Sequence, residues 1–448
     1  MTSVYSKIAP GSSLTVNDHY DFFKIPPTET TELGGTYISA QPSSIADSGS
    51  LVQVVVPADD ARATNLQESF IMVKGKFVKR TTRANLPAAG ETAMKVVAED
   101  NLAHTLFDRC TLSINNEEVF HTSNYPQLAY MRTLLRESKD IKETRLAVEG
   151  WLASTKSPAV DFGEISAPNL ASRKALIANG KEVVLVFRLH TLFDKTSRHL
   201  PPNTSLKLIL HKASPKSYCL SSEAEFDVDF KLSTLEWFVR RIDLNPAVIT
   251  AWGSQLVSGA EYILPVDRPR LRTYTINTGV TEQRIVVQEH DTLPLTVAVA
   301  LVEQAALVGD FTKSQFKYAP HNLSSIELTI DGITVGKRLE CNFENGEAAH
   351  AYMHSLASLG MFDKDVSNGI TYEEFKTNRT VFVWSLTDTH TEGESIFHLK
   401  QRGALQVVLR FATAPTTTLS AVILDVREDL VRQNLEDRHI QWKLLCEK

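Results

Sequence analysis

The two halves of this 448-residue chain repeat one another in the order of their apolar segments. Residues 112–119 (LSINNEEV) match residues 328–335 (LTIDGITV), and each segment reads as a strand, a two-residue turn and a second strand. The Asn-Asn and Asp-Gly pairs at the two centres tolerate the positive φ angles that two-residue hairpin turns require. This duplication constrains the chain more than any single motif, because it predicts two similar domains in tandem.

Three further matches follow the hairpins in the same order in both halves. The first joins two segments that we predict to be helices, and the other two join predicted strands. The pairs are residues 129–135 with 351–357, residues 184–189 with 381–386, and residues 206–210 with 405–409. A period of about 200 residues is too long for a short-repeat solenoid and fits two domains of similar size.

Most apolar segments are short, rich in Val, Ile, Thr and Phe, and separated by polar turn clusters, which is typical of β-strands. The clearest are residues 51–56, 69–78, 183–189, 206–210, 381–386, 405–409 and 421–426. Helical periodicity is limited to residues 127–137 and 347–359. The most apolar stretch, residues 295–308, is interrupted at Glu303 and Gln304 and is shorter than the roughly 20 residues of a membrane helix, so we predict a buried strand. The pattern predicts an all-β fold of tandem (double) jelly-roll β-sandwiches with short helical inserts.

We expect four parts along the chain. Residues 1–50 form an N-terminal arm and lead-in, residues 51–225 the first jelly roll, residues 226–432 the second jelly roll, and residues 433–448 a charged C-terminal tail. The division between the rolls is expected near the polar, acidic stretch Ser221–Phe230, because such stretches commonly connect domains.

The charge balance argues against a protein that condenses nucleic acid. The chain has 47 basic and 53 acidic side chains, a net charge of −6, and its first 50 residues contain only Lys7 and Lys24 as basic residues. Neutralised phosphates supply most of the non-specific affinity for nucleic acids, so this arm is not a DNA-binding tail. We expect no sequence-specific nucleic-acid binding.

Neither a signal peptide nor a cysteine framework is visible. Residues 1–15 lack the apolar run of a signal peptide, so we expect synthesis without one. Cys110, Cys219, Cys341 and Cys446 lie more than 100 residues apart, and no C-x-x-C pair occurs. This spacing disfavours both a zinc site and a disulfide framework and predicts a reducing compartment.

A search for catalytic and metal-binding motifs gives only weak candidates. The P-loop, dinucleotide-binding, nucleophile-elbow and H-E-x-x-H patterns are absent from the sequence. Residues 363–374 place oxygens as a calcium loop does, but Asn368 stands where the loop needs glycine and Gly369 comes one place late. We therefore favour a polar surface loop and expect no metal, no cofactor and no catalytic residue.

Two histidine clusters and a run of basic residues can also be explained without a functional site. The clusters are His190, Asp194 and His199, and Asp388, His390 and His398. Neither lies on a regular element that would direct three ligands to one point, so we attribute both to chance. The basic run comprises Lys74, Lys76, Lys79, Arg80 and Arg83. Lysines that alternate along a strand are typical of a solvated face.

Several strings, in shared order, resemble the hexon-like, double-jelly-roll major capsid proteins of Maverick/Polinton elements, adintoviruses and adomaviruses. The resemblance runs from about residue 20 to residue 432, and the matching strings are residues 21–30, 65–74, 106–115, 188–190, 238–242, 368–371 and 405–411. The positions carried over as structural are Phe22, Phe23, Pro26, Pro27, Arg188, Leu189, His190, Arg240, Arg241, Asn368 and Gly369.

The resemblance implies a structural virion protein with no catalytic residues. It implies a homotrimer that forms a pseudo-hexagonal capsomer, and capsomers that tile an icosahedral shell around double-stranded DNA. Implied partners are neighbouring capsomers and penton and minor capsid proteins, with no membrane span, and assembly in the nucleus is one expectation. Residues 80–105, 138–180 and 336–380 interrupt the strand pattern and are expected to form outer towers and subunit contacts.

Two other classes of function remain open from the residues alone. A non-enzymatic protein of two sandwiches could bind carbohydrate or protein on its loops, and would not need an obligate trimer. An enzyme on a jelly-roll scaffold would need a histidine triad on one strand pair, which the sequence does not show.

Overall fold

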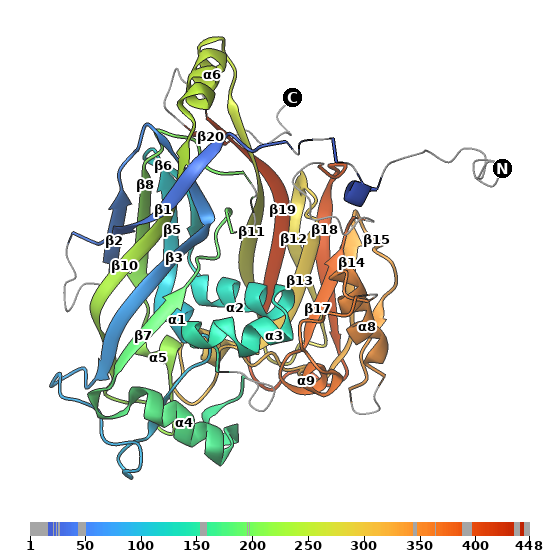
Figure 1. Ribbon diagram of the computed structural model, residues 1–448. Helices are drawn as coiled ribbons and strands as arrows, with labels where there is room; N and C mark the ends of the chain where they lie inside the picture. The colour runs from blue at the N-terminus through green and yellow to red at the C-terminus, as the bar shows by residue number, and fades with distance from the viewer. Residues whose placement is uncertain are drawn as a thin grey trace, which may run out of the picture.

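The computed structural model describes most of the 448 residues of the chain. The described residues are 17–433 and 440–442, except residues 21, 24, 26, 44–50, 153–158, 195, 197, 344–346, 363 and 388–396. Figure 1 shows two sandwiches of antiparallel strands lying side by side, with helices between and below them.

The first sandwich contains eight strands in two four-stranded sheets, ordered β1-β10-β3-β7 and β2-β8-β5-β6. The strands are β1 (Glu32–Ala40), β2 (Leu51–Val56), β3 (Arg62–Val78), β5 (Phe107–Ile114), β6 (Glu117–Thr122), β7 (Glu182–Phe187), β8 (Leu206–Lys212) and β10 (Asp229–Leu244). Two short strands, β4 (Val96–Ala98) and β9 (Cys219–Ser221), pair only with each other.

The second sandwich repeats this order in the sheets β11-β19-β13-β17 and β12-β18-β14-β15. Its strands are β11 (Tyr262–Ile276), β12 (Glu282–Thr292), β13 (Thr296–Glu303), β14 (Leu323–Ile330), β15 (Ile333–Thr334), β17 (Val381–Ser385), β18 (Arg402–Phe411) and β19 (Leu419–Gln433). β16 (Leu339–Glu340) adds to β14, and β20 (Ile440–Trp442) adds to β19. Counting the eight main strands of each unit from one, both units have sheets 1-8-3-6 and 2-7-4-5, which is the jelly roll. The predicted all-β double jelly roll is confirmed.

Strand pairing divides the chain later than the sequence pattern suggested. β10 pairs along its length with β3 and β1, so it completes the first roll. The acidic stretch before it is the loop that enters β10, and the link between the rolls is α6 (Pro246–Val257). By pairing, the first roll spans residues 32–244, where the sequence suggested 51–225. Pairing over such long sequence distances leaves no local signal in an acidic loop.

The repeated motifs occupy equivalent places in the two rolls. The hairpin turns have positive φ angles of 49° and 70° at Asn115 and Asn116 and of 50° and 81° at Asp331 and Gly332. The two predicted helices are α2 (Tyr125–Arg136) and α8 (Ala349–Ser358), each between the fifth and sixth strands of its roll. The local turn chemistry therefore sets the same hairpin twice.

Short helices and turns fill the connections, and the buried apolar side chains of both rolls form one continuous cluster. The other helices are α1 (Leu102–Thr105), α3 (Lys139–Glu143), α4 (Ala167–Ile177), α5 (Pro215–Tyr218), α7 (Gln304–Val308) and α9 (Tyr372–Thr377). The apolar stretch predicted as a buried strand is β13, which ends at Glu303 before α7 begins. No helix among the described residues is long and apolar enough to cross a membrane.

Candidate functional site

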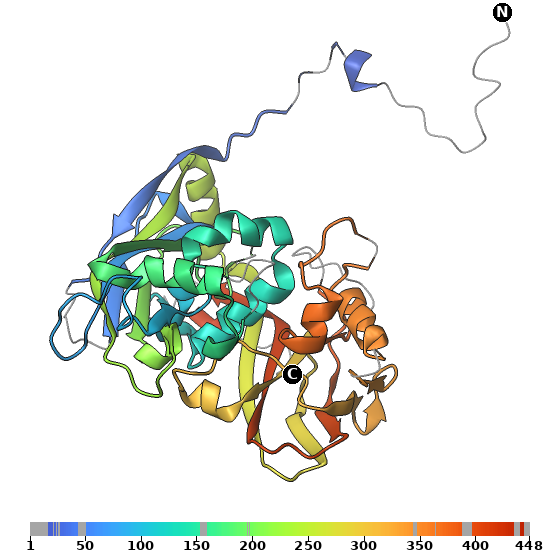
Figure 2. The same cartoon turned by 90° about the horizontal axis from the view of Figure 1, so that it is seen from below.

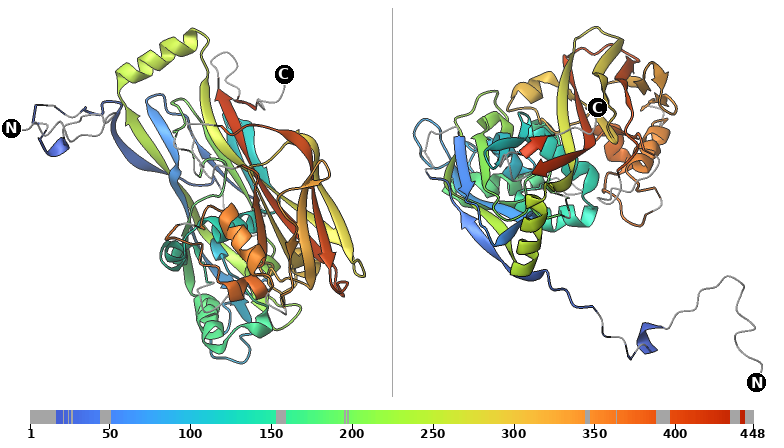
Figure 3. Two further views of the ribbon diagram at one scale, coloured as in Figure 1. Left: turned by 90° about the vertical axis from the view of Figure 1, so that its right-hand side faces the viewer. Right: turned by 90° about the horizontal axis from the view of Figure 1, so that it is seen from above.

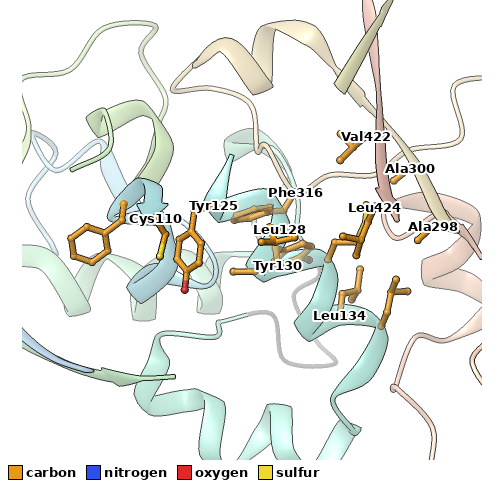
Figure 4. Packing of buried hydrophobic residues seen from close by; sticks show 14 of the residues in the cluster. Cys110, Tyr125, Leu128, Tyr130, Leu134, Ala298, Ala300, Phe316, Val422 and Leu424 are labelled. Carbon is orange, nitrogen blue, oxygen red and sulfur yellow. The ribbon is translucent and has the colours of Figure 1, made fainter. Parts of the chain in front are cut away.

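Helix α2 is the centre of the junction between the two rolls, which Figure 2 shows side by side. Every residue of this helix from Tyr125 to Leu135 is buried. The ring of Tyr130 stacks on Phe316, which follows α7 of the second roll, with centroids 4.1 Å apart. Leu134 points toward Leu424 of β19, as Figure 4 shows. The apolar core therefore continues from one roll into the other through α2.

Polar contacts fix the register of this junction. The side-chain amide of Gln127 donates to the carbonyl oxygen of Gln315 at 2.7 Å, and its oxygen accepts from the hydroxyl of Tyr318 at 2.7 Å. At the end of α2, Arg136 lies 3.8 Å from Asp267 of β11. Buried polar contacts of this kind favour one arrangement of the two rolls.

A cavity of about 360 Å³ remains beside this contact, between α2 and the sheet of β11, β19, β13 and β17. Two of its ionisable groups are already engaged: Asp267 with Arg136, and His398 with Glu428 at 2.7 Å. These two charged groups of the cavity are therefore held in ion pairs.

Asn368 and Gly369, which the sequence placed in a polar surface loop, belong to the junction, where Asn368 is buried. The buried ammonium of Lys142 donates to the carbonyl oxygens of Asn368 at 2.7 Å and of Leu134 at 2.6 Å. Burial lowers the pKa of Lys142 to about 7. Gly369 has φ 75°, and a Cβ there would lie 2.8 Å from the Cβ of Lys139. The loop of the second roll that contains Asn368 and Gly369 therefore holds α3 of the first roll in place.

Metal binding has no support in the described part of the chain, where no group of three His, Cys, Asp or Glu side chains could hold an ion. Asp388 and His390 lie outside the described residues. His190 lies 3.8 Å from Asp194, whereas His199 faces Glu32 at 3.8 Å, so that cluster does not converge.

The Arg188-Leu189-His190 string follows β7 and has structural contacts. Arg188 donates to the carbonyl oxygen of Gln67 at 3.2 Å, and Leu189 packs against the core. The ring Nε2 of His190 lies 3.1 Å from the hydroxyl of Thr133 in α2, and burial lowers its pKa to about 4. The string therefore anchors the end of β7 to α2.

Arg240 and Arg241 point to opposite faces of β10. Arg240 donates to the carbonyl oxygen of Gly35 at 3.0 Å and lies over the ring of Tyr37 at 5.1 Å. Arg241 is fully buried and donates to the hydroxyl of Thr64 at 2.6 Å and to the carbonyl oxygen of Pro57 at 2.7 Å. The pair holds β1 and the β2–β3 loop against β10.

The arm before β1 presents apolar side chains to solvent. Phe22 and Phe23 are exposed, Phe23 by 99%, and Pro27 is also exposed, while Pro26 lies outside the described residues. The arm leaves the body beside α6, where the side chain of Asn245 donates to the carbonyl oxygen of Thr30 at 3.0 Å. Figure 3 shows α6 projecting from this end of the molecule.

Sequence reasoning missed an aromatic surface on the sheet β1-β10-β3-β7. Phe70, Met72 and Lys74 are partly exposed and alternate along β3 with buried residues. Phe70 stacks on Phe238 of β10 with centroids 5.0 Å apart, and Tyr37 of β1 is 5.5 Å from Phe70. Lys74, taken from the sequence as a mark of a solvated face, lies on this face. The sequence signal that could have revealed this surface is the alternation of Phe70 and Met72 with the inward-facing residues of the same strand.

Comparison with known proteins supports the fold. No family model matches the chain. It is 20% identical over 326 residues to "Uncharacterized protein F54H12.2" of Caenorhabditis elegans, a match that covers 70% of this chain and 73% of that protein.

Solved structures of viral capsid proteins share its architecture over nearly the whole chain. The "PBCV-1 virus capsid, quasi-atomic model" has 11% identity, covers 94% of this chain and 100% of its own, and has a TM-score of 0.61. The Sputnik virophage structure has 10% identity, coverages of 98% and 94%, and a TM-score of 0.63. The mavirus major capsid protein has 13% identity, coverages of 97% and 95%, and a TM-score of 0.53. At these identities the likeness establishes the double-jelly-roll fold.

Proposed function

We propose that the chain is a hexon-like major capsid protein. In this function, three copies form a pseudo-hexagonal capsomer, and capsomers tile an icosahedral shell around double-stranded DNA. The observation that carries the proposal is the pair of jelly rolls with identical strand order, fixed side by side through α2. Three such pairs around one axis approximate sixfold symmetry, so a single chain can fill a hexagonal lattice.

The fold shared with viral capsid proteins over more than nine-tenths of the chain supports this proposal. The lineage of Maverick/Polinton elements, adintoviruses and adomaviruses is proposed from the sequence resemblance. The proposed location is the virion, with neighbouring capsomers, penton proteins and minor capsid proteins as partners. The exposed Phe22 and Phe23 of the arm are proposed to contact a neighbouring capsomer.

The solution mass of the purified full chain tests this function. We expect a trimer of three times 49.8 kDa that persists on dilution and shows hexagonal outlines by negative-stain imaging. A stable monomer at every concentration, including in the presence of minor capsid protein, contradicts the proposal and favours the two-sandwich binding protein.

A further inference from the structure

Helices α2 and α8 both lie between the fifth and sixth strands of their rolls in chain order but are covered differently. α2 is buried from Tyr125 to Leu135, because its own roll covers one side and the second roll covers the other. In α8, only Ala351 and Ser355 are buried. Met353 is 41% exposed, and Phe362, just beyond the helix, is 65% exposed. α8 therefore has its own roll beneath it and lacks the second cover that α2 has.

The two equivalent sheets show the same asymmetry. We call the surface of β11-β19-β13-β17 that faces α2 and α8 the second-roll outer face. Its residues are Ala298, Ala300, Val381, Val383, Val422 and Leu424, which are cross-strand neighbours and are all buried. The corresponding surface of β1-β10-β3-β7 is the first-roll outer face. Its residues are Tyr37, Phe70, Met72, Val184, Val186 and Phe238, none of which is fully buried.

We propose that the exposed side of α8, which we call the α8 side and which carries Met353 and Phe362, covers the first-roll outer face of another copy of the chain. The α8 side of one copy packs on the first-roll outer face of the next copy, and so repeats between chains the contact that α2 makes with the second roll within a chain. This inference rests on the proposed function, since it names the surfaces that close the capsomer. A contact between two different surfaces of one chain closes into a ring when the rotation permits.

The chemistry of the first-roll outer face fits a second copy. Phe70 stacks on Phe238 on its two central strands, β3 and β10, and the charged side chains of Lys74, Glu236 and Arg240 lie on the same two strands around this aromatic pair. Aromatic residues, methionine and arginine are enriched at specific protein interfaces. The opposing surface offers Met353 and Phe362, and methionine and aromatic residues are enriched at such interfaces. The contact of α2 with the second roll within one chain gives the geometry that we propose for the contact between copies.

A pair of matched valines tests the proposal by solution mass. Val184 is 49% exposed on β7, the edge strand of the first-roll outer face, and Val55 is 51% exposed on β2, an edge strand of the other sheet of that roll. We expect Val184→Arg to convert the trimer into monomer, a threefold fall in mass, because a charge cannot be buried unpaired. We expect Val55→Arg to leave the trimer intact.

The outcomes separate this inference from the function beneath it. If wild type and both variants are trimers, the subunits meet elsewhere and this inference is overturned, while the capsid function stands. If both variants dissociate equally, the contact is not specific to the first-roll outer face, and the inference again fails. If the wild type itself is a monomer, the proposed function fails together with the inference.

Cross-linking keeps the proposal testable if Val184→Arg misfolds. In a background with Cys446→Ser, the remaining cysteines Cys110, Cys219 and Cys341 are buried. A variant with Val184→Cys and Met353→Cys, treated with a short bismaleimide, is expected to give covalent dimers and trimers on a denaturing gel. Each single variant, and the pair Val55→Cys with Met353→Cys, is expected to give monomer. A trimer by mass that gives no Val184–Met353 product overturns the inference.

Discussion

The sheets β1-β10-β3-β7 and β11-β19-β13-β17 have the same topology and opposite surroundings. On the second, small and β-branched side chains such as Ala298 and Val383 lie buried beneath helices. On the first, aromatic side chains such as Phe70 and Phe238 occupy the equivalent surface and stay partly exposed. Strand order alone therefore does not set which face of a sheet is covered. Neighbouring elements, here α2 and α8, decide it.

The largest effect on stability is expected at the covered junction between the two rolls. Phe316 is fully buried at the junction and stacks on Tyr130, whereas Phe238 is only partly buried on the first-roll outer face. We expect Phe316→Ala to lower the free energy of unfolding by about 3–5 kcal/mol, because it leaves a cavity between the rolls. In the monomeric Val184→Arg background, the control Phe238→Ala should cost clearly less. Urea unfolding measures both, and equal losses would show that the two environments do not differ.

The pH dependence of stability tests the same difference between the two environments, because Glu99 is buried at the junction. Its carboxylate accepts from the hydroxyl of Ser314 at 3.3 Å, and burial raises its pKa from 4.5 to about 7. Between these two values the folded state binds more protons than the unfolded state, so stability falls as pH rises from about 4.5 to 7. Glu99→Gln is expected to remove up to about 3 kcal/mol of this pH dependence.

Unfolding measured at pH 5 and at pH 7 checks this expectation. The control is Glu236→Gln, which changes the same side chain on the partly exposed first-roll outer face. A variant at Glu99 that keeps the full pH slope of the wild type would contradict a role for this carboxyl group.

A smaller effect on stability is expected where the loop of the second roll contacts α3. Gly369 combines φ 75° with a Cβ position only 2.8 Å from Lys139, whereas Gly336 has φ 67° with open space around it. Gly369→Ala is expected to cost about 2–3 kcal/mol, from backbone strain and the clash, and Gly336→Ala about 1 kcal/mol, from strain alone. Thermal unfolding compares the two, and identical shifts would exclude the clash with Lys139.

Local chemistry explains which parts of this structure were predictable. The turns at Asn115 and Asp331 follow from residues that tolerate positive φ, and β13 ends where Glu303 interrupts its apolar run. The place of β10 in the first roll depends on pairing with β3, far away in sequence, so the acidic loop before it looked like a domain boundary.

The candidate site was less predictable, because its residues act through distant partners. Asn368 and Gly369 were expected in a polar surface loop, whereas Asn368 is buried, since nothing nearby in the sequence shows that Lys142 meets them. The alternation of Phe70 and Met72 with buried residues predicts a two-sided strand, but only the assembled rolls show that one side lacks cover. Residues that meet across domains carry no local signature.

The finest test compares one residue type at equivalent positions of the two rolls. Val184 of β7 and Val381 of β17 align in the sequence repeat, yet Val381 is buried and Val184 is half exposed. Val381→Ala is expected to lower the free energy of unfolding by about 2 kcal/mol at every protein concentration, because its cover lies within the chain. Val184→Ala is expected to change the stability of the isolated chain by less than about 0.5 kcal/mol. It should lower the melting temperature of the trimer, because in the trimer the next copy covers this side chain. Melting curves of the trimer test this expectation, and a Val184→Ala trimer that melts at the same temperature as the wild type would mean that no copy covers this face.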